Sequence, residues 1–236
     1  MKSYENKILN GNTPFAVSEA YRTMRTNIMY SKCTDKCPVY AFTSAAPNEG
    51  KTLNCINTAL SFAQIGKKVL IVDLDMRNPS QHLALETSNT NGVSEFLAGV
   101  SDEPNFRKTL YENLNFICGG RIPPDPSELL HSERLPMMIE LAKKNYDMVF
   151  LDLPPVGIVS DAANISEYVS GYIIVLEADV SDVRLLIDAT KMLETVGANI
   201  VGFLFNAVDP KNDKLYSAKY GPAGRYSAMY GDNGDK

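Results

Sequence analysis

Residues 39–66 read VYAFTSAAPNEGKTLNCINTALSFAQIG. The stretch begins with an apolar run typical of a buried strand, continues through a loop that ends in Gly50, Lys51 and Thr52, and passes into a helix-like pattern over residues 52–65. Strand, loop and helix in this order are the context that a phosphate-binding P-loop, or Walker A motif, requires. The loop amides and the helix N-terminus would receive phosphate oxygens, Lys51 would neutralise the β and γ phosphates, and the Thr52 hydroxyl would bind Mg²⁺. We therefore expect ATP and Mg²⁺ as cofactors. The expected nucleotide-binding residues of this segment are Ala46, Pro47, Asn48, Glu49, Gly50, Lys51, Thr52 and Leu53.

Two positions of the loop depart from the consensus GxxxxGK(S/T). Ala45 stands where the consensus has glycine, and Asn48 stands where many relatives have another glycine. Asparagine tolerates left-handed backbone angles better than other non-glycine residues, so we expect Asn48 to keep the loop geometry at the cost of some strain.

Near-continuous apolar runs alternate with amphipathic stretches along the chain. The runs lie at residues 39–44, 69–75, 115–118, 148–153, 172–178 and 201–206, and the principal helical patterns between them at 52–65, 127–145 and 182–196. Such runs are typical of strands buried on both faces, and their alternation with helices indicates a parallel sheet. We therefore predict a doubly wound α/β fold with a mainly parallel sheet, the P-loop NTPase class, in one domain over residues 1–208.

Aspartates follow two of the predicted strands. VLIVDLDMR ends with Asp73, Asp75 and Arg77, and MVFLDLPP contains Asp152. The carboxyl ends of parallel strands meet at one edge of the sheet, where ligands of such folds bind. Aspartates at this edge can hold Mg²⁺, mainly through its water molecules. Helix capping is the alternative role for such aspartates.

Two segments lie outside the strand and helix alternation. Residues 14–30 are rich in helix formers and predict a separate helix before the first strand. Residues 209–236 contain almost no aliphatic residues and cannot bury enough area to fold alone, so we expect a flexible tail. The tyrosines clustered in this tail are Tyr216, Tyr220, Tyr226 and Tyr230.

Together these segments resemble the bacterial tyrosine kinases (BY-kinases). SAAPNEGKT, VLIVDLDMR and MVFLDLPP have the forms of the Walker A, A′ and B motifs of that family, in the same order. GGRIPPDPSELLHS (119–132) is similar to its Pro-Ser-Glu-Leu-Leu segment, and EAYRTMR (19–25) fits its ExxRxxR motif. With the tyrosine cluster, the resemblance covers nearly the whole chain.

The resemblance implies a protein-tyrosine kinase that regulates capsular or exopolysaccharide synthesis and phosphorylates its own tail tyrosines. By this resemblance the catalytic residues are Lys51, Asp73, Asp75 and Asp152. Asp73 would be the base for the tyrosine hydroxyl, Asp75 and Asp152 would orient the waters of an Mg²⁺ ion also bound by Thr52, and Asn206 would lie beside adenine. Glu177 stands where the family often has a basic residue.

Two kinds of partner are expected. Glu19, Arg22 and Arg25 share one side of the first helix, and the arginines can pair with carboxylates of a neighbouring subunit, so we expect the unphosphorylated protein to form a homo-oligomeric ring. The alternative is a solvated helix face with an i,i+3 pair of Glu19 and Arg22. The second partner is implied by the resemblance. A transmembrane activator, or adaptor, would stimulate the kinase and recruit it to the inner face of the membrane.

Composition excludes some partners and leaves two other functions open. The net charge of -5, without a basic block, disfavours nucleic acid. No apolar run approaches the length of about 18 residues that a membrane span needs, so we expect a cytoplasmic protein. One alternative is an ATPase switch of the cell-division or plasmid-partition type, although its signature lysine is replaced here by Ala46. The other is a catalytically weak nucleotide-binding scaffold, suggested by Ala45 and Asn48.

Overall fold

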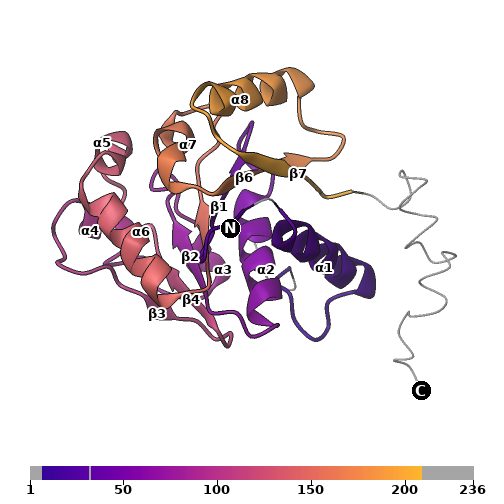
Figure 1. Ribbon diagram of the computed structural model, residues 1–236, viewed down its shortest axis with the longest axis horizontal. Helices are drawn as coiled ribbons and strands as arrows, with labels where there is room; N and C mark the ends of the chain where they lie inside the picture. Colours follow the sequence, from indigo (N-terminus) through magenta and orange to yellow (C-terminus); the bar gives the residue numbers. More distant parts are fainter. Residues whose placement is uncertain (1–6, 32, 209–236) are drawn as a thin grey trace, which may run out of the picture.

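A single sheet runs through the centre of the protein (Figure 1). The computed structural model describes residues 7–31 and 33–208, and within them the sheet has seven strands. In sheet order they are β3 (Arg107–Lys108), β4 (Leu114–Ile117), β2 (Val69–Asp73), β5 (Met148–Asp152), β1 (Val39–Ser44), β6 (Gly171–Glu177) and β7 (Ile200–Asn206). All neighbours are parallel except β3 and β4, which are antiparallel. The prediction of a mainly parallel sheet is confirmed.

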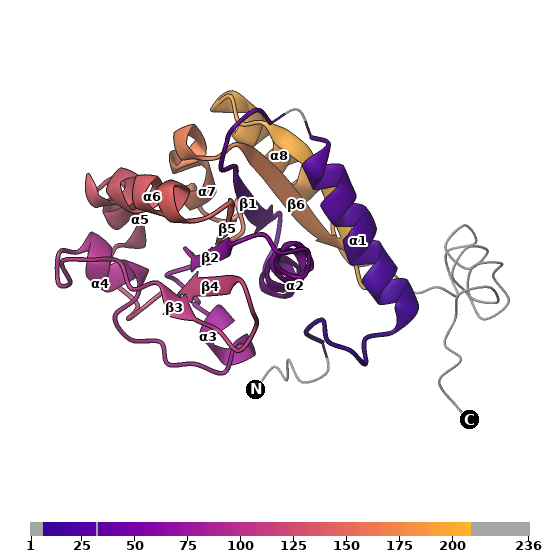
Figure 2. The same ribbon diagram turned by 60° about the horizontal axis from the view of Figure 1, so that its bottom comes forward.

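Helices cover both faces of this sheet, as Figure 2 shows. They are α1 (Phe15–Met29), α2 (Lys51–Ala63), α3 (Gln81–Ala84), α4 (Val93–Leu97), α5 (Pro126–Leu130), α6 (Arg134–Asn145), α7 (Asp161–Asn164), the 3-10 helix η1 (Ser166–Tyr168) and α8 (Val183–Thr195). Residues of α1, α2 and α3 belong to one buried cluster, and residues of α4 to α8 belong to the other. The fold is therefore doubly wound.

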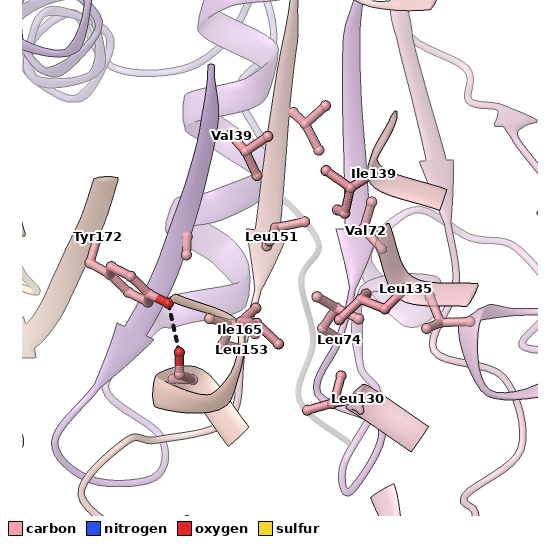
Figure 3. Close-up of a cluster of buried hydrophobic side chains, with 14 of the residues drawn as sticks. Val39, Val72, Leu74, Leu130, Leu135, Ile139, Leu151, Leu153, Ile165 and Tyr172 are labelled. Atoms are coloured by element: carbon pink, nitrogen blue, oxygen red, sulfur yellow. Dashed lines mark hydrogen bonds between the residues drawn. The ribbon is translucent and has the colours of Figure 1, made fainter. Parts of the chain in front are cut away.

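The two clusters follow from the alternation of side chains along each strand. In β1, Val39 and Ala41 belong to the cluster beneath α6 and α8, whereas Tyr40 and Phe42 belong to the cluster beneath α2. On the α6 side, Figure 3 shows the Tyr172 hydroxyl donating to the carbonyl oxygen of Ala162 at 2.6 Å, which links β6 to α7. Because both faces of β1, β2 and β5 are buried in these clusters, the sequences of these strands are nearly continuous runs of apolar residues.

Two details of the predicted architecture are wrong. The single helical stretch predicted over residues 127–145 is divided into α5 and α6. Pro136 lies in the first turn of α6, where its missing N–H is tolerated, but it could not continue a preceding helix. Strand β7, predicted to be buried on both faces, is the edge strand of the sheet, and its Phe203 and Phe205 are 48% and 64% exposed.

The fold brings the predicted strand-end residues to one edge. The P-loop follows β1, and Asp73 and Asp152 end the neighbouring strands β2 and β5, where they are register partners. Within residues 7–31 and 33–208 there is no helix with the length and apolarity of a membrane span. The tail 209–236, with Tyr216, Tyr220, Tyr226 and Tyr230, lies outside the described residues.

Candidate active site

The P-loop between β1 and α2 has the backbone geometry that its sequence predicts. Asn48 has a φ of 68°, which confirms its left-handed conformation, and Gly50, the N-cap of α2, has a φ of 92°. A Cβ atom on Gly50 would lie only 2.2 Å from Asn206 Nδ2. Glycine is therefore required at position 50 both by its backbone angle and by the close approach of β7.

The departure from the consensus at Ala45 introduces no left-handed strain. Ala45 is buried, and it is not among the described residues that have positive φ. Its carbonyl oxygen lies 2.2 Å from the position that a Cβ on Gly157 would occupy, so the turn after β5 packs directly against the loop. Thr43 holds the same turn, because its hydroxyl donates to the Pro154 carbonyl at 2.8 Å and accepts from the Val156 amide at 3.1 Å.

Glu49 ties the P-loop to the segment after β6. Its carboxylate accepts hydrogen bonds from the Ala46 amide, at 2.9 Å, and from the Ser181 hydroxyl. Ser181 in turn accepts from the Glu177 amide at 2.8 Å. The Glu49 side chain therefore stabilises the loop from within, and what it can offer a nucleotide is its backbone amide.

Asp73 and Asp75 lie at the end of β2 in different environments. The Asp73 carboxylate is fully buried and accepts from the backbone amides of Ser80 and Gln81, both at 3.2 Å. Burial, and then the nearby carboxylates of Asp152 and Asp75, raise the pKa of Asp73 well above its usual range. Burial also raises the pKa of Asp75, against the opposing effect of the Lys51 ammonium. A carboxylate with a raised pKa is suited to accept a proton near neutral pH.

Asp152 is the strongest candidate for a cation-binding residue. The residue is 1% exposed, and neither carboxylate oxygen has a hydrogen-bond partner among the described residues. Burial raises its pKa to about 6, while the Lys51 ammonium acts to lower it. The buried Gln81 side chain lies close by, and its Oε1 also lacks a partner in the described part of the chain. Buried polar groups are normally hydrogen-bonded. The unpaired oxygens of Asp152 and Gln81 therefore indicate a binding site for a cation and its water molecules.

The residues at this edge fit Mg²⁺ held together with a nucleotide. Among the described residues, no group of three His, Cys, Asp or Glu side chains could hold a metal ion by itself. Mg²⁺ usually keeps several waters and binds through one or two carboxylates and substrate phosphates. Thr52 could supply its hydroxyl, which lies 3.1 Å from Ser80 Oγ, and Asp152 could supply its unpaired carboxylate. Asp75 lies in the same charged cluster.

Asn206 ends β7 directly above the P-loop. Its amide nitrogen donates to the carbonyl oxygen of Glu49 at 3.2 Å. Together with Asn54, Tyr21 and Phe205 it lines a cleft of about 490 Å³ between α1 and β7. The structure thus places an amide side chain at the junction of the P-loop and a largely apolar cleft.

A hydrogen-bonded cluster that the sequence did not reveal anchors the Pro-Ser-Glu-Leu-Leu segment. Arg77 donates to both carboxylate oxygens of the buried Asp161, at 2.9 and 3.1 Å, and to the Ser127 hydroxyl at 2.7 Å. Ser127 also donates to Asp161 at 2.7 Å. These residues come from three segments, with Arg77 and Asp161 separated by 84 positions, so no local pattern could have predicted their contact.

The predicted oligomerisation residues lie on α1, away from the carboxylates. Glu19 and Arg22 form an i,i+3 ion pair in which Arg22 remains mostly exposed. Arg25 instead faces its own chain and donates to the carbonyl oxygen of Ser61 in α2. Of the three, only Arg22 is exposed, whereas Glu19 and Arg25 are half-buried.

The P-loop, the strand-end carboxylates and the doubly wound sheet define a P-loop nucleotide-binding protein. Residues 48–196 match the AAA domain family. The chain is 35% identical over 190 residues to the tyrosine-protein kinase YwqD of Bacillus subtilis, covering 80% of each protein. It is 33% identical over 199 residues to the tyrosine-protein kinase wzc of Salmonella typhimurium, covering 84% of this chain but only 28% of the length of wzc.

Solved structures agree with these relatives. The kinase domain of Escherichia coli tyrosine kinase ETK superposes with a TM-score of 0.77 at 33% identity, covering 81% of this chain and 75% of that domain. The chimerical protein CapA2B2 gives a TM-score of 0.81 at 31% identity, with 88% and 92% covered. The chain belongs to the family of bacterial tyrosine-protein kinases. The septum site-determining protein MinD of Pyrococcus horikoshii, at 22% identity and a TM-score of 0.62, shares the fold alone.

Proposed function

We propose that this protein transfers the γ-phosphoryl group of ATP to tyrosine hydroxyls, and that its first substrates are Tyr216, Tyr220, Tyr226 and Tyr230 of its own tail. The observation that carries this proposal is the buried Asp152 carboxylate without a partner, next to the P-loop residue Lys51 and the paired strand-end residue Asp73. This combination would provide a phosphate site, a cation site and a proton acceptor at one edge of the sheet.

Each residue would act mainly by position and charge. ATP would supply the phosphoryl group, and Mg²⁺ would neutralise charge on its phosphates. The amides of residues 46–53 would bind phosphate oxygens, and Lys51 would stabilise the charge that develops during transfer. Thr52, Asp75 and Asp152 would hold Mg²⁺ and its waters, and Asn206 would orient the adenine at the mouth of the cleft.

Asp73 would act as the base. A tyrosine hydroxyl has a pKa near 10, so it needs a nearby acceptor as its oxygen attacks the γ-phosphorus. The phenolic proton would pass to the Asp73 carboxylate, the bond between the γ-phosphorus and the bridging oxygen would break, and ADP would leave. The raised pKa of Asp73 supports this role, because it increases the proton affinity of the carboxylate.

The proposal includes an assembly and a cellular setting. The protein would form a ring through α1, in which the tail of one subunit reaches the site of its neighbour. It would work in the cytoplasm, bound to the inner face of the membrane by a transmembrane adaptor that activates it. Phosphates on several tails add about -1.5 to -2 charges each and would repel across the ring, which favours its release. Its physiological role would be to regulate capsular or exopolysaccharide synthesis.

Intact-mass measurement after incubation with ATP, Mg²⁺ and an activating partner tests this function. The wild-type chain should gain several phosphates, whereas Lys51→Met should gain none while its far-UV circular dichroism spectrum shows that the fold is intact. Lys68→Met is the matched control, since Lys68 is exposed immediately before β2, and it should behave like the wild type.

Truncation after Pro210 identifies the acceptors. Loss of most added phosphates in the truncated chain would support the tail as substrate, and an unchanged number would contradict it. A wild-type protein that hydrolyses ATP without gaining phosphate would instead favour the ATPase switch, and one that only binds ATP would favour the scaffold.

A further inference from the structure

A hydrogen-bonded network joins the first helix to the P-loop, and Tyr21 lies at its centre. Tyr21 belongs to α1, in the middle of the EAYRTMR segment, and α1 packs against α2, the helix that follows the P-loop. The Tyr21 hydroxyl donates to Asn54 Oδ1 at 2.9 Å and lies 3.1 Å from Asn57 Nδ2, from which it accepts. It therefore binds two α2 side chains with one donor and one acceptor.

Asn54 carries this contact to the P-loop. Its side-chain nitrogen donates to the carbonyl oxygen of Gly50 at 3.0 Å, and its backbone amide donates to the same oxygen at 3.0 Å. A Cβ on Gly50 would lie 3.3 Å from Asn54 Nδ2 and 2.2 Å from Asn206 Nδ2. Gly50 is thus held between two asparagines, and the orientation of Asn54 is fixed by the Tyr21 hydroxyl.

Asn57 extends the network to the start of the described chain. Its side chain donates to the carbonyl oxygen of Lys7 and accepts from the amide of Leu9, both at 2.9 Å. Asn54 and Asn57 are 3% and 1% exposed, so water cannot readily replace a lost partner. Burial also raises the pKa of Tyr21, which keeps its hydroxyl protonated and able to donate.

We propose that Tyr21 is a positioning residue for the nucleotide: through Asn54 it fixes the peptide between Gly50 and Lys51 at the start of α2, and the N–H of that peptide, which belongs to Lys51, is one of the amides proposed to bind phosphate. The inference rests on the proposed nucleotide site. It adds that the position of α1 affects ATP affinity. A contact with another subunit through Glu19 and Arg22, which flank Tyr21 on the same helix, would therefore alter nucleotide binding.

Tyr21→Phe tests the inference, because it removes the hydroxyl and keeps the ring. We expect the dissociation constant for ADP with Mg²⁺, measured by calorimetry, to rise about three- to tenfold, the effect of one buried hydrogen bond. The KM for ATP should rise by a similar factor with a smaller change in kcat. Tyr146→Phe is the matched control, since the Tyr146 hydroxyl accepts from Asn115 Nδ2 at 2.9 Å, between the start of β4 and the end of α6.

The control separates positioning from general stability. Both variants should lower the melting temperature, but only Tyr21→Phe should weaken ADP binding. Equal dissociation constants for Tyr21→Phe and the wild type would overturn the inference while leaving the proposed function intact. Failure of the wild-type protein to bind ADP would overturn both.

A double-mutant cycle with Asn54→Ala checks the route. If Tyr21 acts through Asn54, adding Tyr21→Phe to Asn54→Ala should change ADP affinity by less than twofold. A full additional loss in the double variant would mean that Tyr21 does not act through Asn54, and the proposed route would be wrong.

Discussion

Asp152 shows how a buried carboxylate without a hydrogen-bond partner affects stability. Its two oxygens have no partner among the described residues, and burial raises its pKa to about 6. The unfolded chain has an aspartate pKa near 4, so between about pH 4 and pH 6 the folded protein binds more protons than the unfolded chain. The contribution of this group to stability therefore falls as the pH rises through that window.

We predict that Asp152→Asn stabilises the nucleotide-free protein while removing its Mg²⁺ dependence. At pH 7.5 its free energy of unfolding should exceed that of the wild type by roughly 1 to 3 kcal/mol, the equivalent of one to two pKa units. Urea unfolding at pH 7.5 and pH 4.5 measures the difference, which should shrink at the lower pH as wild-type Asp152 takes up a proton.

Asp102→Asn, at an exposed position, serves as the control and should change stability little at either pH. The prediction would be wrong if Asp152→Asn were less stable than the wild type at pH 7.5, or if the difference in their free energies of unfolding did not change with pH. Either result would show that other groups of the folded protein stabilise the Asp152 charge.

Some individual site residues could be predicted and others could not. Lys51, Asp73, Asp75 and Asp152 follow strands, and a parallel sheet collects strand ends at one edge, so sequence order suffices to group them. Tyr21 and Asn54 are 33 positions apart and meet only because α1 packs on α2. Contacts of that kind depend on how two helices are oriented relative to each other. The hydrophobic periodicity of each helix does not determine that orientation.

The short helix α5 depends on contacts outside itself. Its five residues are too few to form a stable helix alone, although Asp125 caps it by accepting from the Glu128 amide at 3.2 Å and Pro126 occupies its first turn. Ser127 in α5 hydrogen-bonds to Arg77 and Asp161, which hold it against α7.

We predict that Arg77→Lys loosens α5. An ammonium cannot reproduce the two parallel bonds to Asp161 and the bond to Ser127, so amide hydrogen exchange over residues 126–130 should accelerate and stability should fall by about 1 to 2 kcal/mol.

Arg107→Lys is the comparison variant, because Arg107 also makes several bonds, to Ser88 and to the carbonyl oxygen of Thr90, in another part of the surface. It should leave exchange over 126–130 unchanged. Exchange that is equally unchanged in Arg77→Lys would show that α5 does not depend on the cluster.

Strands were easier to predict than short helices. The start of β1 and the start of β5 match their apolar runs, because both faces of these strands are buried. The two-residue strand β3 and the four-residue helices α3 and α7 carry no periodic signal long enough to detect. The apolar run of β7 resembles that of a central strand, since composition does not tell which strand ends a sheet.

The proposed assembly of several copies would depend on which α1 side chains can reach a neighbouring subunit. Arg25 already binds the Ser61 carbonyl oxygen in its own chain, whereas Glu19 and Arg22 pair with each other on the surface. A surface ion pair of this kind stabilises a helix by only a few tenths of a kcal/mol. Its removal should therefore leave the protein folded.

We predict that the combined change Glu19→Ala, Arg22→Ala and Arg25→Ala reduces the mass measured by light scattering to that of a monomer. The pair Glu19→Ala and Arg22→Ala should have most of this effect, because the third change also removes a contact within the chain. As a control, Glu140→Ala with Lys143→Ala removes an i,i+3 ion pair on α6 and should leave the mass unchanged. An identical mass for the triple variant and the wild type would refute the role of α1 in assembly.

The exposed ring of Phe205 offers an optical probe. The chain contains no tryptophan, and Phe205 lies on the edge strand one position before Asn206, in the wall of the cleft. Because its side chain is 64% exposed, a larger ring can be accommodated there without repacking the core. Phe205→Trp would introduce a single indole, whose emission could be excited selectively at 295 nm, a wavelength at which tyrosine absorbs little. The arrival and departure of nucleotide could then be followed in real time by stopped-flow fluorescence, with no dye attached to the protein or to the ligand.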